Sequence, residues 1–494
     1  MKAVIRIIVS LFAVMFVGVG LACWMAPDKV AAQFGLEAVR AAGLTSTRAD
    51  LGGMFLALGV MCALGAWTGR RSALRAAALV LAAIVAGRLV GGIANGAVGV
   101  RDLVIEVTAV LLLWVLARER RDTAETTTRR SHRGLKIATV SIGVIVASAV
   151  LALLNASVEQ AIFDRGAMKM TARVNTAPLA DDALRVAIAG SSAPLPSRAR
   201  AKACVVVFAG GKFWVVDAGP ESTENLVLWG IPLSQIGGVL ITHYHSDHIG
   251  DLGELQLQTW AGGRPQPLDV YGGPGVDALV DGFNMAYRLD QGYRTTHHGE
   301  KVMPSAAWGM VAHTVTLDGQ ATPAKDRTGP VYDDGTLRIT AIEVDHSPIE
   351  PAYAYRFDYK GRSVVVTGDL KYHPPLVKSA MNADLMVSEA ISRSMTHALE
   401  NAANTVGRDR TKAIMHDVQD YHISPEEAAK IANDAHVRLL AFYHLLPAPD
   451  GFLTRRLFAH GVNAVRQGEW TMAGDGSMYT MPFGSTAVRI GRIQ

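Results

Sequence analysis

Hydrophobic and polar positions follow two different patterns along this chain. Up to about residue 155, Ala, Val, Leu, Ile and Gly dominate, and charged residues are confined to short clusters. After about residue 184, short apolar runs alternate with turn residues, and His and Asp become frequent. The first pattern is typical of membrane-spanning helices, and the second is typical of a soluble globular domain.

Five apolar segments of the first part are long enough, or nearly so, to cross a hydrocarbon layer about 30 Å thick. They cover about residues 7–25, 51–68, 76–98, 103–117 and 136–154. We predict from them a four-helix transmembrane domain over 1–120, then a basic cytoplasmic loop and a fifth transmembrane helix over 121–156, followed by a linker over 157–183. Buried helices of a soluble domain, or a signal peptide in the first segment alone, are the alternatives.

Lys and Arg residues in the short loops indicate the orientation of these segments. With five crossings, the basic clusters at 2–6, 70–75 and 118–136 all fall on one side, which the positive-inside rule assigns to the cytoplasm. The rest of the chain is then expected outside. We therefore predict a multi-pass protein of the bacterial inner (cytoplasmic) membrane whose second part faces the periplasm or the exterior.

Two charged residues, Arg88 and Glu106, fall inside the third and fourth apolar segments. Charges inside a membrane are costly and often functional, although a structural ion pair between these two is the plainer interpretation. Together with glycines at positions 52, 53 and 87, they make residues 1–117 similar to a family of small four-helix bacterial membrane domains of unknown function. That resemblance implies no activity.

Composition narrows the function only a little. The 494 residues exceed one ordinary domain and half of them are apolar, with a mean hydropathy of +0.21. A net charge of +4 gives no sign of a nucleic-acid-binding surface. Cys23, Cys62 and Cys204 form neither a metal-ligand spacing nor a disulfide framework.

Runs of β-forming residues separated by turn signals follow residue 184. We predict strands at 184–190, 203–208, 213–217, 238–242, 268–271, 337–344, 353–359, 363–367, 385–388 and 438–442. A helix is expected from Pro425, with Ser424 as its N-cap and Glu427 completing a capping box. Strands interleaved with helices indicate an α/β sandwich.

Four metal-capable side chains occupy six positions directly after one of these strands. His243 and His245 are separated by one residue, so an extended strand end can aim both at one cation. Asp247 and His248 follow on the next turn and can address a second cation. Imidazole and carboxylate suit zinc or a similar metal, and two metals about 3.5–4 Å apart can share a hydroxide.

This His-x-His-x-Asp-His motif after a strand, with Asp217-Ala-Gly upstream, resembles the metallo-β-lactamase fold family over about residues 184–494. The resemblance implies a four-layer αβ/βα sandwich that binds two zinc ions, or another divalent pair such as Mn or Fe, at one edge. It also implies three further ligands. These are His346 before a strand, Asp369 as the bridging carboxylate of a Gly-Asp step, and His444 after a late strand.

The spacing of His346, Asp369 and His444 is similar to that of the ribonuclease Z-like branch. In that branch a His before a helix is thought to protonate or orient the leaving group, and His422, two residues before Ser424, matches it. A role next to the helix cap alone is the alternative. The chain departs from the branch in Gly-Asp369-Leu, in Tyr-His444-Leu, and in lacking a Gly/Pro-rich basic arm that would grip tRNA.

An insertion after the first motif, about residues 281–299, is rich in Tyr, Arg and His. One interpretation is that it forms a lid over the metals, in which Tyr293, Arg294, His297 or His298 contacts an anionic substrate. A plain surface helix is the alternative.

Together these residues predict a membrane-anchored, dinuclear metal-dependent hydrolase. Asp247 would orient a metal-bridging hydroxide, and His422 would give a proton to the leaving group. Because the domain is expected outside the cytoplasm, we predict a small anionic ester as substrate, foremost a phosphodiester or a sulfate ester. The enzyme would then be a phosphodiesterase, an arylsulfatase or a lactonase. No nucleic acid is favoured as a partner. The alternatives are a ribonuclease Z-like endonuclease that processes tRNA 3′ ends and a non-enzymatic membrane sensor with a metal-binding module. The oligomeric state is not indicated.

Overall fold

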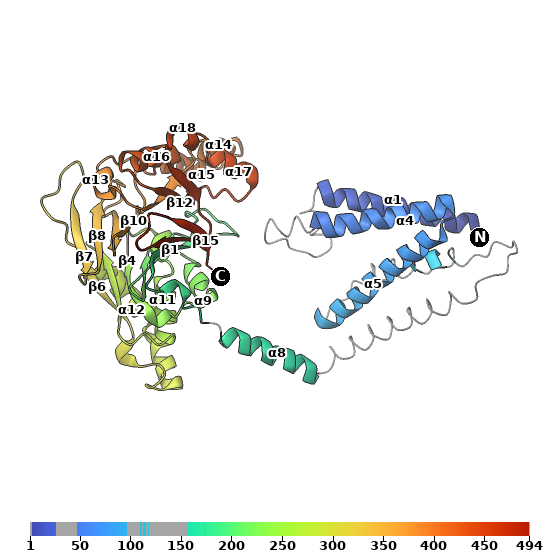
Figure 1. Ribbon diagram of the computed structural model, residues 1–494, viewed down its shortest axis with the longest axis horizontal. Coiled ribbons are helices and arrows are strands. Elements are labelled where there is room, and N and C mark those ends of the chain that lie inside the picture. The colour runs from blue at the N-terminus through green and yellow to red at the C-terminus, as the bar shows by residue number, and fades with distance from the viewer. Residues whose placement is uncertain are drawn as a thin grey trace. The chain divides into compact units, whose positions relative to one another are not determined.

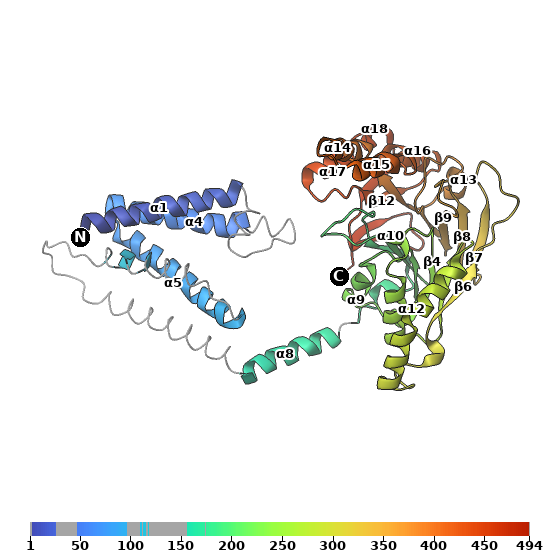
Figure 2. The same cartoon turned by 180° about the vertical axis from the view of Figure 1, so that it is seen from behind.

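The computed structural model describes residues 2–25, 47–95, 109–110, 112–114, 117, 156–172 and 174–493. The chain divides into an N-terminal unit, Met1–Thr171, and a C-terminal unit, Ala172–Gln494, which Figures 1 and 2 draw from opposite sides. The predicted span 136–154, most of the span 103–117 and the basic loop between them lie outside the described residues. So do Glu106 and the side chain of Arg88.

The described part of the N-terminal unit consists mainly of helices. They are α1 (Lys2–Met25), a π-helical turn (Thr47–Gly52), α4 (Gly53–Thr68), α5 (Arg71–Asn95) and α8 (Ala156–Thr171). Among the described residues, two stretches are long and apolar enough to cross a membrane, Ile7–Met25 and Arg48–Thr68. They match the first two predicted spans. Two such helices do not establish a multi-pass domain, which stays a prediction.

Glycines allow α1 and α4 to pack closely. A Cβ atom at Gly59 would lie 2.6 Å from Val17 Cγ2 and 2.9 Å from Val17 N, so the two backbones approach where no side chain intervenes. Larger apolar residues surround this contact, among them Phe16 and Leu58. Small residues at helix contacts are typical of helices that associate in lipid.

A helix occupies much of the predicted linker. Where residues 157–183 were expected to connect two domains, α8 covers Ala156–Thr171. The segment is too polar for a membrane span, but it contains no Pro and only one Gly, so nothing in it interrupts a helix. The first strand then begins at Ala183, one residue from its predicted start.

The C-terminal unit contains two mixed β-sheets, of eight strands in the order β15-β14-β1-β2-β3-β4-β5-β6 and seven in the order β13-β12-β11-β10-β9-β8-β7. The strands of the first sheet are β1 (Ala183–Gly190), β2 (Cys204–Ala209), β3 (Lys212–Val216), β4 (Ile236–Leu240), β5 (Leu268–Gly272), β6 (Met310–Thr314), β14 (Ser477–Pro482) and β15 (Arg489–Arg492). Those of the second sheet are β7 (Thr328–Asp333), β8 (Leu337–Glu343), β9 (Tyr353–Tyr359), β10 (Arg362–Val366), β11 (Leu385–Ile391), β12 (Leu439–Leu446) and β13 (Glu469–Met472). One half of each sheet is antiparallel. The parallel half is β3 to β6 in the first sheet and β10 to β13 in the second.

The two sheets face each other across a shared apolar core. On β2, Val205 and Val207 belong to this core, whereas Val206 and Phe208 belong to a second apolar cluster on the outer face of the sheet. A strand buried on both faces needs apolar residues at every position. The Cys-Val-Val-Val-Phe-Ala sequence of β2 supplies them.

Helices cover the outer face of each sheet (Figure 1). Their bounds are α9 (Ser222–Leu228), α10 (Ser246–Ile249), α11 (Leu252–Ala261), α12 (Val276–His298), α13 (Leu376–Ala380), α14 (Arg393–Thr405), α15 (Asp409–Asp417), α16 (Pro425–Asp434), α17 (Phe452–Phe458) and α18 (Val462–Val465). Residues of α9, α11 and α12 pack on the first sheet, and residues of α13, α16 and α18 pack on the second. The C-terminal unit is therefore a four-layer αβ/βα sandwich, which is the predicted fold.

The ten predicted strands are present within a few residues of their predicted bounds, and α16 begins where it was expected. Its capping box is confirmed, because Glu427 N donates to Ser424 Oγ at 3.2 Å and Ser424 N donates to the Glu427 carboxylate at 2.8 Å. The hydrophobic pattern missed β6, β7, β13, β14 and β15. These strands are short and largely half-buried or exposed, so apolar residues do not mark them clearly.

Candidate metal and catalytic site

All seven predicted metal ligands lie at one edge of the sandwich, where strands of both sheets end. They are carried by the loop after β4 (His243, His245), by α10 (Asp247, His248), by the loop after β8 (His346), by the loop after β10 (Asp369) and by the last part of β12 (His444). Because the parallel strands of each sheet end at the same edge, residues far apart in the sequence meet there.

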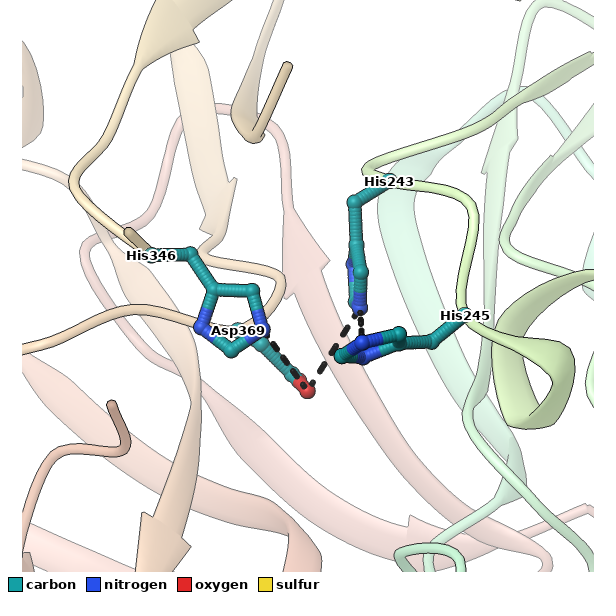
Figure 3. A group of neighbouring side chains, drawn as sticks. All are labelled: His243, His245, His346 and Asp369. Carbon is teal, nitrogen blue, oxygen red and sulfur yellow. Dashed lines mark hydrogen bonds and ion pairs between the residues drawn. The ribbon is translucent and has the colours of Figure 1, made fainter. Parts of the chain in front are cut away.

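His243, His245, His346 and Asp369 form one cluster (Figure 3). Each offers one ligand atom, and these atoms lie within 4.8 Å of one another. Asp369 Oδ2 is 3.8 Å from His243 Nε2 and 4.0 Å from His346 Nε2. His243 Nε2 is 3.0 Å from His245 Nδ1. Three imidazoles and a carboxylate around a common point are a donor set that suits zinc.

Asp247, His248 and His444 form a second cluster, which Asp369 also contacts. His444 Nε2 is 3.1 Å from Asp247 Oδ2. Asp369 Oδ2 is 3.3 Å from His248 Nε2, and Asp369 Oδ1 is 3.4 Å from His444 Nδ1. Asp369 therefore reaches both clusters, which is the position that a bridging carboxylate requires.

Several of these ligand atoms are buried without a hydrogen-bond partner. They are His248 Nε2, His346 Nε2, Asp369 Oδ1 and His444 Nδ1. Each unpaired buried polar atom costs roughly 1–3 kcal/mol, so four of them at one place indicate a site built to hold a ligand. Imidazole nitrogens and carboxylate oxygens fit a divalent metal pair, but this donor set does not distinguish zinc from Mn or Fe.

Hydrogen bonds at the opposite ring nitrogen fix the tautomer of two histidines. His248 Nδ1 donates to Asp217 Oδ2 at 2.8 Å, and His346 Nδ1 donates to the carbonyl oxygen of Tyr421 at 2.8 Å. Each bond leaves Nε2 with a lone pair for a metal. Asp217 also accepts hydrogen bonds from Thr242 N and Oγ1, both at 2.8 Å. The sequence identified Asp217 only as part of a motif, whereas the structure shows that it orients His248.

A β-bulge directs His444 into the site. β11 and β12 pair regularly up to Glu389 and Tyr443, and the register then shifts so that Ala390 pairs with Leu445. His444 is the extra residue and has a φ of 42°. A positive φ is strained for a residue with a side chain, and bulges of this kind commonly re-aim functional side chains.

The Gly-Asp step before the bridging carboxylate has a steric cause. Gly368 has a φ of 59°, and a Cβ atom there would lie 2.8 Å from both Thr242 Cβ and Tyr353 O. Only glycine fits between these groups. Gly368 thereby places Asp369 next to the loop that follows β4.

Sequence analysis missed one acidic residue of the site, Glu389 on β11. Its carboxylate oxygens are 2.9 and 3.0 Å from His422 Nδ1, and both side chains are buried. His422 Nδ1 is also 3.8 Å from Asp369 Oδ2. The available signal is a Glu in a strand that is otherwise apolar except for Ser388. This signal is weak, because a single Glu near a strand end is usually exposed.

Burial and mutual charges shift the pKa values of the clustered groups. Burial raises the pKa of Asp247, but the charges of His248 and His444 outweigh burial and lower this pKa to about 2. Burial lowers the pKa of His444, but the surrounding carboxylates, Asp369 foremost, raise it to about 10. For His346 burial prevails and lowers the pKa to about 4. His346 is therefore a neutral imidazole near pH 7, as a metal ligand must be.

The four predicted substrate contacts lie on α12, a helix of 23 residues. Tyr293 is 68% exposed, Arg294 Nε donates to Asp290 Oδ2 at 2.7 Å, and the rings of His297 and His298 contact each other. None of these four belongs to a metal-capable group within the described ranges. The far end of α12 projects from the sandwich in both views (Figures 1 and 2). The segment is helical, and both the role over the metals and the plain surface helix stay open as predictions.

Comparison with known proteins gives the following relatives. A "Beta-lactamase superfamily domain" family matches residues 214–445, and a domain of unknown function, DUF4345, matches residues 4–117. Ribonuclease Z of Mycolicibacterium paratuberculosis is 32% identical over 268 residues, which are 54% of this chain and 87% of that protein. Ribonuclease Z of Mycobacterium bovis is 30% identical with the same coverage. Among solved structures, the short form of human tRNase Z is 21% identical and aligns with 60% of this chain and 99% of its own, at a TM-score of 0.43.

These relatives overturn the expectation of a small anionic ester with no nucleic acid favoured. They are ribonucleases, so their substrate is RNA. The expectation failed because a net charge of +4 averages over the whole chain, and because the predicted position outside the cytoplasm rested on crossings that lie largely outside the described residues. With 32% identity across 87% of a ribonuclease Z, the chain belongs to the ribonuclease Z family of the β-lactamase superfamily.

Proposed function

We propose that the C-terminal unit is a metal-dependent ribonuclease that hydrolyses a phosphodiester bond at the 3′ end of precursor tRNA. One observation carries the hydrolytic part of this proposal. Asp369 Oδ2 lies within 4.0 Å of the Nε2 atoms of His243, His248 and His346. Membership of the ribonuclease Z family supports RNA as the substrate.

The two clusters would hold one cation each. His243, His245 and His346 belong to the first position, Asp247, His248 and His444 to the second, and Asp369 to both. When bound, a divalent pair lowers the pKa of water and compensates the negative charge that develops on the phosphoryl group. The unpaired Nε2 and Oδ1 atoms described above support this assignment.

His422 is proposed as the proton donor to the leaving oxygen. Its Nδ1 is held by Glu389, so Nε2 is the atom left to face the substrate. A buried carboxylate in that position orients the ring. Asp247, with its carboxylate ionised at neutral pH because its pKa is about 2, would accept a hydrogen bond from the attacking water and orient it.

The N-terminal unit is proposed as a membrane anchor. The two apolar helices within Ile7–Met25 and Arg48–Thr68, and the match of residues 4–117 to a separate domain family, support an attachment domain over about 1–120. RNA is a cytoplasmic substrate, so the C-terminal unit must face the cytoplasm. With the N-terminus in the cytoplasm, this orientation requires an even number of crossings, contrary to the five predicted from the basic loops.

The activity is tested with the full chain in an uncharged detergent, supplied with zinc or manganese and with a precursor tRNA that carries a 3′ extension. We expect one cut that removes the extension, abolished by a chelator and by Asp369→Asn. The matched control is Asp358→Asn, which removes the charge of a half-exposed carboxylate paired with Arg356. Metal-replete protein that leaves this RNA intact would refute the proposed substrate.

Location is tested separately with reporters fused after residue 494. A fluorescent protein that matures in the cytoplasm should be active, and alkaline phosphatase, which folds only outside, should be inactive. The reverse result would support five crossings and exclude an RNA substrate in the living cell, whatever the purified protein cleaves.

A further inference from the structure

A cavity of about 480 Å³ lies away from the metal ligands, beside the last two strands of the first sheet. Residues 175–178, β14 and β15 form its walls. Three arginines line it, Arg185, Arg489 and Arg492, and none of the lining residues is a carboxylate. A concave site with arginines and no acidic wall favours an anionic ligand.

Two of the three guanidinium groups retain free donors. Arg185 is already held by the Asp182 carboxylate and by the Ala180 carbonyl oxygen. Arg492 donates only to the carbonyl oxygen of Asp475, at 2.7 Å. Arg489 has no hydrogen bond or ion pair among the described residues. Arginine carries five donors in a planar fork that matches phosphate oxygens, so Arg489 and Arg492 together can bind one phosphate group.

The half-buried carboxylate of Asp475, close to Arg492, does not neutralise these arginines. Asp475 accepts hydrogen bonds from Ser191 N and Oγ at 3.0 and 2.6 Å and from Ala201 N at 2.7 Å. Its oxygens are therefore occupied inside the fold, and only its backbone carbonyl reaches Arg492.

Most of the rest of the wall is apolar, apart from Asn175 and Thr480. Met478, Ile490 and Ile493 line the cavity together with Pro178, and Ile490 is 56% exposed. Inorganic phosphate would leave these side chains in contact with water. A ligand that carries a phosphate next to an apolar group would cover them, which contributes roughly 25 cal/mol for each Å² of apolar surface buried.

The position of the cavity in the chain indicates where such a ligand comes from. Its wall at residues 175–178 follows α8 directly, and four residues from Thr171 to Asn175 span at most about 14 Å. α8 itself exposes two large apolar side chains, Phe163 and Met168, as helices at a membrane surface do. We propose that this cavity binds the phosphate group of an anionic phospholipid and holds the C-terminal unit at the membrane surface.

The test uses the full chain in an uncharged detergent and short-chain dioctanoyl phosphatidylglycerol as the probe, with binding followed by calorimetry. The double variant Arg489→Gln/Arg492→Gln should bind at least about tenfold more weakly, the loss of one charged hydrogen-bonding contact. Arg408→Gln/Arg410→Gln is the matched control, because it removes the same charge from two exposed arginines elsewhere. Ile490→Asn should weaken binding of the lipid but not of glycerol 1-phosphate.

Each other outcome has a definite meaning. Equal binding of phosphatidylcholine, or unchanged binding by the double variant with its thermal unfolding intact, would overturn the proposal. Inorganic phosphate binding as tightly as the lipid would assign the cavity to free phosphate and exclude the lipid. A raised KM for RNA with unchanged lipid binding would make the two arginines part of an RNA surface. Failure of RNA cleavage by the unaltered chain would not affect any of these readings.

Discussion

In the N-terminal unit, apolar side chains fill the interior and also cover the outside, where Leu11, Val14 and Trp67 are 63%, 65% and 70% exposed. The C-terminal unit also has an apolar core, but buried polar groups gather at one edge of it, where Asp369 and Glu389 are 2% and 0% exposed. The two units therefore differ in what is unusual about them: exposed apolar side chains in the first and buried charged side chains in the second.

Under the proposed function, this difference separates membrane attachment from chemistry. The exposed apolar side chains of the N-terminal unit favour an apolar surrounding, and within the described ranges this unit contains no metal-capable cluster. A buried charged cluster lowers stability unless its members satisfy one another or a ligand. Its presence at one edge of the sandwich indicates that the C-terminal unit bears this cost for catalysis.

The largest effect is expected from Asp369→Asn. The change removes the negative charge of a side chain that contacts both clusters, so metal affinity should fall more than about 100-fold, since even residues outside the ligand shell are worth 10- to 100-fold. Bound metal is measured by mass spectrometry after dialysis, together with RNA cleavage. The packing of α1 on α4 should be unaffected. Retention of two metals per chain would contradict the bridging role.

His422→Ala should lower kcat by about 10²- to 10⁴-fold, which is the usual contribution of a general acid. Metal content should stay unchanged, because His422 is assigned to the substrate side and not to a cation. Measuring kcat and metal content separately matters, since His422 also lies in a metal-capable group with Glu389 and His444. Loss of one metal in the variant would make His422 a ligand. Glu389→Gln should give a smaller fall in kcat, as it keeps the ring in place without the charge.

How far the sequence predicts this site depends on the distance between residues along the chain. His243, His245, Asp247 and His248 lie within six positions, and their spacing alone indicates two metals. Asp369 and His444 could be located only through a family resemblance, because nothing in the sequence pairs a residue with a partner about 100 positions away. The family resemblance did not reveal Glu389 either, since its burial follows from the pairing of β11 with β10 and β12.

The same contrast between local and long-range signals decides which strands and helices can be predicted. Strands such as β2, buried on both faces, are apolar throughout and are found from their sequence. β15 is fully exposed and pairs only with β14, so its four residues show no pattern. The position of α8 was missed because helix propensity in a segment of mixed polarity does not by itself distinguish a helix from a linker.

Gly59→Leu should damage the N-terminal unit and leave the other unchanged. Its side chain would overlap Val17, and overpacking of this kind costs about 1–3 kcal/mol. We expect the contact between α1 and α4 to be lost at a lower temperature. The fluorescence of Trp67 measures this loss, because its Nε1 donates to Ser10 Oγ across these helices. RNA cleavage in detergent should stay the same. Parallel loss of cleavage would show that the two units depend on each other.

Metal binding should release protons. Without metal, the pKa of His444 is raised to about 10, so the ring is protonated at pH 7. The charged ring stabilises the metal-free fold fully below about pH 6.5, and this stabilisation is lost as the pH rises through 10. A metal requires the neutral ring. Affinity should therefore rise up to about tenfold per pH unit between pH 7 and 9 for each proton displaced. Calorimetry in buffers of different ionisation enthalpy measures the protons, and heats independent of buffer would contradict the prediction.

The smallest effect is expected from Ser424→Ala, which removes the N-cap of α16 and should cost about 1 kcal/mol. The loss is limited because α16 is also held by apolar packing, with Ala428, Ile431 and Ala432 buried against the second sheet. Hydrogen exchange of the first-turn amides of α16 measures it locally, and Ser424→Thr, which keeps the hydroxyl, is the control. Since Ser424 lies two residues from His422, the variant also separates structure from chemistry. Faster exchange with unchanged kcat is expected, whereas a fall in kcat like that of His422→Ala would mean that the helix cap itself positions the proton donor.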